Sequence, residues 1–155
     1  MTHKEILIAN GFELYNWMTP RLDGLEIKKG KRVLLSVGCL DQAIEHHLAI
    51  CCLLKSKVNG SAFALVRLIF ESFVRGVWLK NCASEAQLSQ FQNDTLQLKF
   101  GQLLEAVEKV DGFESGLLSK LKESAWKAMN SYTHTGFHQA SRRFGKELIE
   151  PTYTD

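Results

Sequence analysis

One stretch, from Ser61 to Asn81, constrains the fold of this chain more than any other part of the sequence. Its length and residue pattern fit a helix of about five turns. Apolar residues fall on every side of that helix, and they are Phe63, Leu65, Val66, Leu68, Ile69, Phe70, Phe73, Val74, Val77 and Leu79. Because a helix that is apolar all round is normally buried, we expect this segment to be the central helix of the protein.

Three charged residues interrupt the central helix at a regular spacing. Arg67, Glu71 and Arg75 are each four residues from the next, and this spacing places them along one side of a helix. Trp78 returns to the same stripe. Because an unpaired buried charge is very costly, these side chains need partners, and the stripe marks where a functional site would lie.

The segment before the central helix predicts those partners. A long helical pattern runs from Lys31 to Lys57, and its apolar face holds Val33, Leu34, Val37, Leu40, Ile44, Leu48, Cys51 and Cys52. Asp41 and Glu45 fall on that same face of the helix. Since the turn to the central helix is short, the two helices should be antiparallel neighbours. We therefore expect Asp41 and Glu45 to be buried partners of Arg67 and Arg75.

The rest of the chain is also helical in pattern, without strand-like alternation. Asn59 and Gly60 suit a left-handed helix end, and Ser61 suits the N-cap of the central helix. Thr19-Pro20 should end the first helix, because the residue before a proline is pushed out of the α region. The sequence predicts an all-α fold, an antiparallel helical bundle of five to seven helices in a single domain over residues 1–155. The further helical segments are Thr2–Met18, Glu85–Gln92 capped by Ser84, Asp94 or Thr95 to Lys109, Glu114–Asn130 and Phe137–Ile149.

A second polar cluster lies near the C-terminal end, and its members are Tyr132, His134, His138, Arg142 and Arg143. The stretch from Asn130 to Gly136 is too polar and β-branched for a regular helix interior, so we expect a helix end or kink there. His134 and His138 are four residues apart, a spacing that can hold a metal on an unbroken helix. Gly136 between them argues against that geometry, so neither a metal site nor a cofactor is predicted.

The two clusters allow two functional interpretations. In the first, a polar cleft binds an anionic ligand such as a nucleotide or RNA, with Arg67 and Arg75 holding phosphate by two-pronged hydrogen bonds. Glu71 and His134 would then transfer protons if the protein is an enzyme. The other residues of this ligand site would be Tyr132, His138, Arg142 and Arg143.

In the second interpretation, the arginine and glutamate ladder only fixes helix register, and the basic residues form a solvated face. The protein is then a non-enzymatic helical interaction or dimerisation module. Long apolar helices with only two prolines favour a homodimer, since twofold pairs are the commonest assembly. No catalytic motif of known chemistry is complete, so the sequence does not decide whether the protein is an enzyme.

Composition bears on location more than on function. The net charge is +2, from 19 Lys+Arg and 17 Asp+Glu, so bulk charge gives no reason to expect a polyanion partner. The N-terminus has no apolar signal core, and no stretch reaches about 18 uninterrupted apolar residues. We expect a cytoplasmic protein without a membrane span.

The cysteines form no C-x-x-C pair and are interpreted as buried free thiols, which suits a reducing compartment. They are Cys39, Cys51, Cys52 and Cys82.

Two blocks of the sequence resemble a known family. SAFALVRLIFESFVRGVWL and, much later, WKAMNSYTHTGFHQASRR resemble an uncharacterised bacterial all-helical family, a domain of unknown function with an FALVR-x-x-FE-x-x-VRG-x-WL helix and a Y-T-H-x-G block. The resemblance covers most of the chain from Val33 to Arg143. That family has no established activity, so the resemblance implies a helical fold and no reaction.

More distantly, the helical layout and the combination of arginine with histidine resemble the HEPN group of toxin and phage-defence ribonucleases. Members of that group carry an R-x(4–6)-H motif on one helix, and this sequence lacks it. RNA cleavage would therefore need a composite site, in which Arg67 or Arg75 meets His134 from a separate helix.

Overall fold

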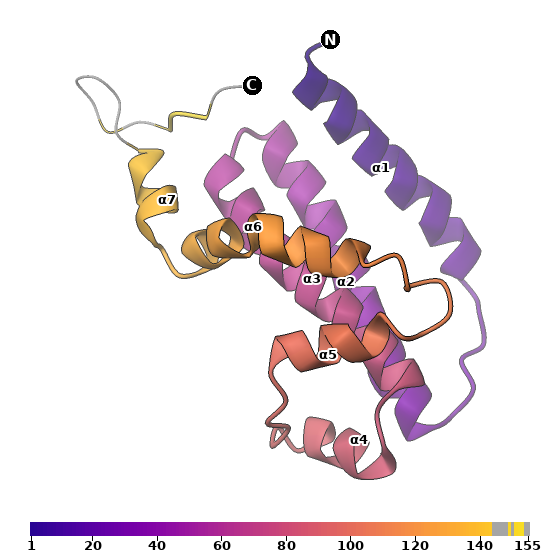
Figure 1. Ribbon diagram of the computed structural model, residues 1–155. Coiled ribbons are helices and arrows are strands. Elements are labelled where there is room, and N and C mark those ends of the chain that lie inside the picture. Colours follow the sequence, from indigo (N-terminus) through magenta and orange to yellow (C-terminus); the bar gives the residue numbers. More distant parts are fainter. Residues whose placement is uncertain (144–148, 150, 154–155) are drawn as a thin grey trace.

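The structure, a computed structural model, describes residues 1–143, 149 and 151–153. Within these residues the chain forms seven helices, which confirms the predicted all-α bundle (Figure 1). α2 and α3 form the centre of the bundle, α1 packs on α2, and α5 and α6 pack on α3. The helices are α1 His3–Leu22, α2 Lys31–Lys55, α3 Asn59–Asn81, α4 Glu85–Gln92, α5 Phe100–Val107, α6 Leu117–Thr133 and α7 Phe137–Ser141.

The α2–α3 hairpin has the most extensive helix–helix contact in the described part of the chain, as the short turn predicted. Gly76 allows the two helices to approach closely. A Cβ atom built on Gly76 would lie 2.7 Å from Leu40 Cγ and 3.2 Å from the carbonyl oxygen of Ser36. The buried Ser36 hydroxyl donates a hydrogen bond of 2.8 Å to the Gly76 carbonyl, so a polar bond also joins the helices at this point.

The hydrophobic core lies where α3 meets α5 and α6. Phe70 of α3 packs edge-on against Phe100 of α5 with 5.2 Å between ring centroids. Phe100 in turn stacks on Trp126 of α6 at 5.0 Å, with only 4° between the ring planes. Phe70 and Trp78 are buried and Trp126 is half-buried, whereas Phe73 of α3 is 36 % exposed.

α1 continues through Pro20, so the prediction that Thr19-Pro20 ends this helix is wrong. A proline in the last turn removes a single N–H donor, which a helix end tolerates better than its interior does. Side chains also bond nearby carbonyls there. The Thr19 hydroxyl donates to the Tyr15 carbonyl at 2.9 Å, and Arg21 Nη1 donates to the Trp17 carbonyl at 2.7 Å.

The turn between α2 and α3 lies slightly earlier than predicted. α2 ends at Lys55, and Lys57 adopts the left-handed conformation with φ 61°. Asn59 and Gly60 therefore belong to the first turn of α3, so the prediction that they end α2 and that Ser61 caps the next helix is wrong. The left-handed residue that ends a helix is usually glycine or asparagine, and here a lysine takes that position.

Two other predicted helices are shorter than expected. The helix expected from Asp94 begins only at Phe100, because Asp94 itself is left-handed with φ 55° and residues 95–99 have no regular secondary structure. Two leucines of that segment pack against the core instead. The last helix, expected to reach Ile149, ends at Ser141, and the part of that prediction falling on residues 144–148 lies outside the described residues.

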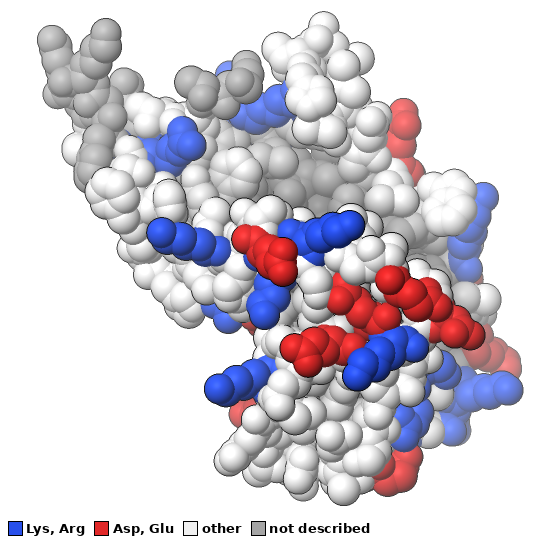
Figure 2. Space-filling model, in the orientation of Figure 1, with Lys and Arg blue, Asp and Glu red and all other residues white. Residues whose placement is uncertain are grey.

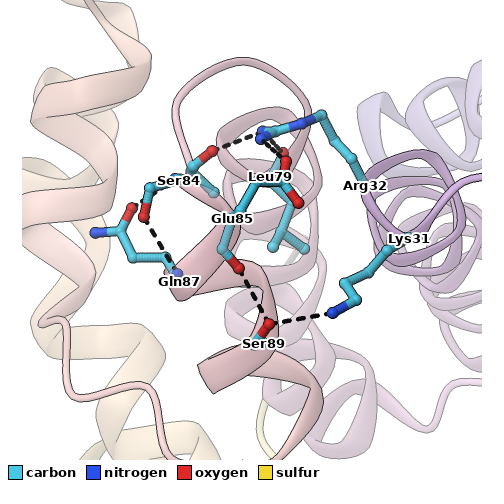
Figure 3. Close-up of polar contacts among 8 residues, drawn as sticks. Lys31, Arg32, Leu79, Ser84, Glu85, Gln87 and Ser89 are labelled. Atoms are coloured by element: carbon cyan, nitrogen blue, oxygen red, sulfur yellow. Dashed lines mark hydrogen bonds and ion pairs between the residues drawn. The ribbon is translucent and has the colours of Figure 1, made fainter.

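The prediction for α4 is confirmed, because Glu85–Gln92 is helical and Ser84 is its N-cap. Ser84 Oγ accepts from the backbone N–H of Gln87, and the Gln87 side chain accepts from the backbone N–H of Ser84. Arg32 of α2 reaches across to this cap (Figure 3). Its Nη2 donates to Glu85 Oε1 at 2.8 Å, and its Nη1 donates to two backbone carbonyls at the end of α3.

Glu108 joins the end of α5 to the start of α6. Its carboxylate accepts a hydrogen bond of 2.6 Å from the Ser119 hydroxyl and one of 2.8 Å from the Ser119 backbone N–H. These bonds, the hydroxyl first, lower the pKa of Glu108 below its ordinary value of 4.5. A carboxyl group whose folded-state pKa is lowered contributes stability above its unfolded pKa and loses that contribution as the pH falls through the folded value.

We therefore expect Glu108→Gln to destabilise the protein at pH 7 by up to about 1 kcal/mol, because the amide oxygen can still accept a bond from Ser119 but carries no charge. The difference from wild type should shrink as the pH is lowered from 7 to below 4.5, because the wild-type carboxylate then becomes protonated too. Urea unfolding of wild type and variant, at pH 7 and at a pH below 4.5, measures the difference in their free energies of unfolding. Glu105→Gln, an exposed change on the same helix, is the control and should have little effect. A difference that grows at acid pH would contradict this account.

α1 is held by α2 and by no other helix to a comparable extent. Where they cross, His47 Nε2 donates a hydrogen bond of 2.8 Å to the Gly11 carbonyl. A Cβ atom built on Gly11 would lie 2.6 Å from Cys51 Sγ, so glycine permits this close crossing. No residue of α1 is buried, and most of the helix surface faces solvent.

α2 is the one helix in the described part of the chain that is long and apolar enough to cross a membrane by length and composition. A core helix of a soluble protein passes the same test, and α2 packs along α3 and carries exposed Asp41 and Glu45. This single helix is therefore weak evidence for a membrane span.

All four cysteines are free thiols, as predicted. Burial raises the pKa of Cys39, Cys51 and Cys82. Cys52 is exposed, so its predicted burial is wrong. Consecutive residues on a helix point in different directions, and it is Cys51 that faces inward.

Candidate functional site

Arg67 of α3 is the centre of the best-formed polar cluster in the described residues. Its Nε donates a hydrogen bond of 2.7 Å to Glu71 Oε1, one turn further along the same helix. Its Nη1 lies 2.7 Å from Nε2 of His134, at the end of α6. The guanidinium carbon lies 5.0 Å from the ring centroid of Trp126. The structure thus brings together three of the predicted site residues, Arg67, Glu71 and His134.

The direction of the Arg67–His134 hydrogen bond follows from the chemistry of arginine. Because a guanidinium has donors and no acceptor, Nη1 of Arg67 donates and Nε2 of His134 accepts. His134 is exposed, and the side chains of Arg67 and Glu71 are 21 % and 19 % exposed. The cluster is therefore reachable from solvent, and a ligand can approach the free edge of the guanidinium.

The end of α6 places His134 next to α3. The predicted helix end is confirmed, because α6 stops at Thr133 and α7 begins at Phe137. The Thr133 hydroxyl donates to the Ala64 carbonyl of α3 at 3.4 Å and to the Met129 carbonyl at 2.9 Å. These bonds anchor the last turn of α6 against α3, so the next residue meets Arg67.

A second group of site residues gathers one to two turns earlier on α3. Tyr132 packs on Phe63 with 5.2 Å between ring centroids, and Tyr153 packs on Phe63 at 5.7 Å. A Cβ atom built on Gly60 would lie 2.8 Å from the Tyr153 hydroxyl and 3.5 Å from Arg143 Nη2. Glycine at position 60 therefore leaves room for these two groups beside the first turn of α3.

Several polar atoms at this end of α3 are buried and have no hydrogen-bond partner within the part of the chain that the structure describes. They are Oδ1 of Asn59, Oε1 of Gln139 and the hydroxyl of Tyr153. A buried polar group without a partner costs free energy. The sequence interpretation missed these residues, because it assigned Asn59 to a helix end. Gly60 lies seven residues before Arg67 and therefore on the same face of α3. That spacing could have indicated that the residues around Gly60 belong to the candidate site.

Arg75 does not join the Arg67 cluster. Its guanidinium carbon lies 5.8 Å from the ring centroid of Phe91 on α4, and its charge acts on Cys39 of α2, where it opposes the larger effect of burial. Its Nε has no hydrogen-bond partner among the described residues, although it is buried. Two turns of helix separate Arg75 from Arg67, about 12 Å along the axis. Arg75 is therefore not placed to hold one phosphate together with Arg67, as the sequence interpretation expected.

The predicted burial of Asp41 and Glu45 is also wrong. Both residues are exposed on α2, and no ion pair joins either of them to Arg67 or Arg75 in the described structure. The fully buried residues of α2 are small, and they are Ser36, Cys39, Ala43 and Cys51. Leu34 and Cys52, which lie beside Asp41 and Glu45 on the helix wheel, are exposed as well, so this edge of the apolar face is turned to solvent.

The remaining predicted site residues, His138 and Arg142, are exposed. The backbone carbonyl of Arg142 accepts hydrogen bonds from the Thr152 backbone N–H and hydroxyl, which join this turn to the segment 151–153. Within the described residues, no three His, Cys, Asp or Glu side chains are placed to hold a metal.

Comparison with known proteins gives one match. A model of the family of unknown function DUF6988 matches residues 40–152, a range that includes α3, α6, α7 and most of α2. Comparisons with curated proteins and with solved structures give no match. The matched range holds Arg67, Glu71 and His134 and leaves out α1. Since the family model covers well over half of the sequence, this chain belongs to the family of unknown function DUF6988.

Proposed function

We propose that the face of α3 next to the end of α6 binds a phosphate-bearing ligand, RNA or a nucleotide. The observation that carries this proposal is the Arg67 guanidinium, which is oriented by Glu71 and Trp126 and contacts His134. Arginine is the side chain best suited to bind phosphate in two-pronged geometry. A guanidinium already held in place loses little freedom when a ligand binds.

Arg143 and Tyr132 extend this binding face. Arg143 lies beside Gly60 in the first turn of α3, where backbone N–H groups and the helix dipole favour an anion. Gly60 and Arg67 are two turns apart on one side of the helix, about 10 Å along its axis. The two arginines can therefore hold two phosphates of one chain, with Tyr132 and Phe63 between them for base stacking.

If the ligand is RNA, the same pair can cleave it. Once Arg67 turns from His134 to the phosphate, Nε2 of His134 would be free to take the proton of a ribose 2′-hydroxyl, whose oxygen attacks the adjacent phosphorus. Arg67 would stabilise the added negative charge, and the departing 5′-oxygen would take a proton from water. This is the composite arginine–histidine arrangement that the distant HEPN resemblance requires, and cleavage of cellular or phage RNA would give a toxin or phage-defence role.

The test compares binding of a short fluorescein-labelled single-stranded RNA, and of ATP, by wild type and by Arg67→Ala. We expect Arg67→Ala to weaken RNA binding at least about tenfold, or ~1.4 kcal/mol. The slope of log affinity against log salt should fall by about 0.7 for each phosphate that the variant no longer neutralises. Arg21→Ala, which removes the same charge from exposed α1, is the matched control and should bind as wild type does.

Incubation with total RNA then separates binding from cleavage. Loss of cleavage in both Arg67→Ala and His134→Ala, with binding retained by the latter, would support the nuclease mechanism. Absence of cleavage by all three proteins would remove it and leave a binding protein. If neither RNA nor ATP binds the wild-type protein, the proposal fails.

A second function is favoured by the bonding of Arg67 itself. Its Nε, Nη1 and ring-facing surface all have partners without any ligand, as in a structural bridge between helices. A non-enzymatic interaction module would then lose thermal stability in Glu71→Gln and respond to no ligand. A ligand at about a hundred times its Kd would otherwise add roughly 2.7 kcal/mol, so a thermal-shift screen distinguishes the two functions.

A further inference from the structure

α1 is apolar on two opposite faces. Its inner face packs on α2 through half-buried side chains that include Ile8, Phe12, Tyr15 and Met18. With about 3.6 residues per turn, Ile6 and Trp17 lie on the opposite side, and Leu7 and Leu14 lie between that side and Met18. All four are 40–57 % exposed, although the Arg21 guanidinium lies over the Trp17 ring at 4.4 Å. A helix with apolar residues on both sides is normally covered on both, yet α2 covers only one.

The exposed apolar residues continue beyond α1. Leu22, Leu25 and Ile27 lie at the end of α1 and in its connection to α2, and Leu34 lies in the first turns of α2; all four are 46–61 % exposed. We call these eight side chains the outer apolar surface: Ile6, Leu7, Leu14, Trp17, Leu22, Leu25, Ile27 and Leu34. They are eight of the seventeen exposed large apolar residues in the described structure, and α1 with its connection runs along one edge of the molecule (Figure 1).

The total surface area indicates how much of the chain is left to cover. The chain exposes 10,479 Å², whereas a compact monomer of 17.5 kDa exposes about 7,900 Å². If the eight undescribed residues contributed the full surface of unfolded chain, about 1,300 Å², an excess of about 1,300 Å² would remain. A standard interface covers about 800 Å² on each partner, so the excess is enough for a stable dimer.

We propose that a second copy of this chain covers the outer apolar surface, in a twofold pair that packs α1 and its connection against the same elements of the partner. A twofold interface uses one self-complementary surface on both copies, and the apolar surface of α1 supplies it. Figure 2 shows many of the charged side chains of this face over the α5–α6 side of the molecule, away from α1. α1 lies outside the residues matched by the family, so this pairing is independent of the site at Arg67.

Sedimentation of the full chain over a range of concentrations tests the proposal. Wild type should sediment as a dimer, and the double variant Leu14→Glu/Trp17→Glu as a monomer with an unchanged circular dichroism spectrum. Leu117→Glu is the matched control, because it places the same charge at a 66 % exposed leucine on α6, and it should remain dimeric. A wild type that stays monomeric at every concentration, or a double variant that is folded and dimeric, would overturn the proposal.

A second measurement needs no substitution. Amide hydrogen exchange of the wild-type protein should slow in α1 and its connection as the concentration rises, and should not change in the first turn of α6. Protection confined to another element would assign the interface elsewhere and overturn the proposal. A monomer that floats with phosphatidylcholine vesicles would show that the surface binds a membrane, and would overturn it as well.

Discussion

Leu79→Ala is expected to lower the free energy of unfolding by about 2–5 kcal/mol. Leu79 is fully buried in α3, in the core where this helix meets its neighbours. Removing its side chain loses the transfer free energy of the deleted methyl and methylene groups and leaves a cavity that dense packing cannot close. Since small domains are stable by only about 5–15 kcal/mol, the variant should lose a large share of its stability.

Urea unfolding followed by circular dichroism measures this loss. Leu68→Ala is the matched control, because Leu68 lies on the same helix, has the same side chain and is 37 % exposed. It should cost clearly less than the buried change. Equal losses in the two variants would show that the interior of α3 is not packed as described.

Gly76→Ala and Gly38→Ala are expected to change stability in opposite directions. A Cβ atom at position 76 would lie 2.7 Å from Leu40 Cγ and 3.2 Å from the Ser36 backbone oxygen, so α2 and α3 must move apart. Overpacking of this kind usually costs about 1–3 kcal/mol. The shift should also strain the hydrogen bond from the Ser36 hydroxyl to the Gly76 carbonyl.

Gly38 is also a helix-interior glycine, but a Cβ atom there would meet nothing within 4 Å. Alanine should therefore stabilise α2 by roughly 0.4–1 kcal/mol, because it reduces the freedom of the unfolded chain. Thermal and urea unfolding of both variants measure the two effects. Stabilisation by Gly76→Ala would contradict the close contact between α2 and α3.

Local signals in the sequence predicted much of the fold. Ser84 identified the start of α4 because its hydroxyl caps the helix, and the apolar run through α3 identified the central helix because such a surface must be buried. Helix ends were predicted less well. Pro20 lies inside α1, and Lys57 takes a left-handed conformation usually left to glycine or asparagine.

The candidate site was predicted in part, for a reason visible in its residues. Arg67 and Glu71 are four apart on one helix, so their pairing follows from local geometry. The contact with His134 joins residues 67 positions apart, and only the tertiary packing of α6 on α3 determines it. Asp41 and Glu45 were assigned to the wrong side of α2, because they share one edge of its apolar face with Leu34 and Cys52, and that edge is exposed.

Trp126 links the candidate site at Arg67 to α5. Its ring stacks on Phe100 and also supports the Arg67 guanidinium, although α5 contributes no polar atom to the cluster. A substitution at Phe100 would therefore tilt the indole and displace the arginine, without touching anything that contacts a ligand. The hydrophobic interior behind Arg67 thus sets how rigidly its guanidinium is held, so substitutions in α5 should alter the affinity for the proposed ligand as much as substitutions of the charged residues do.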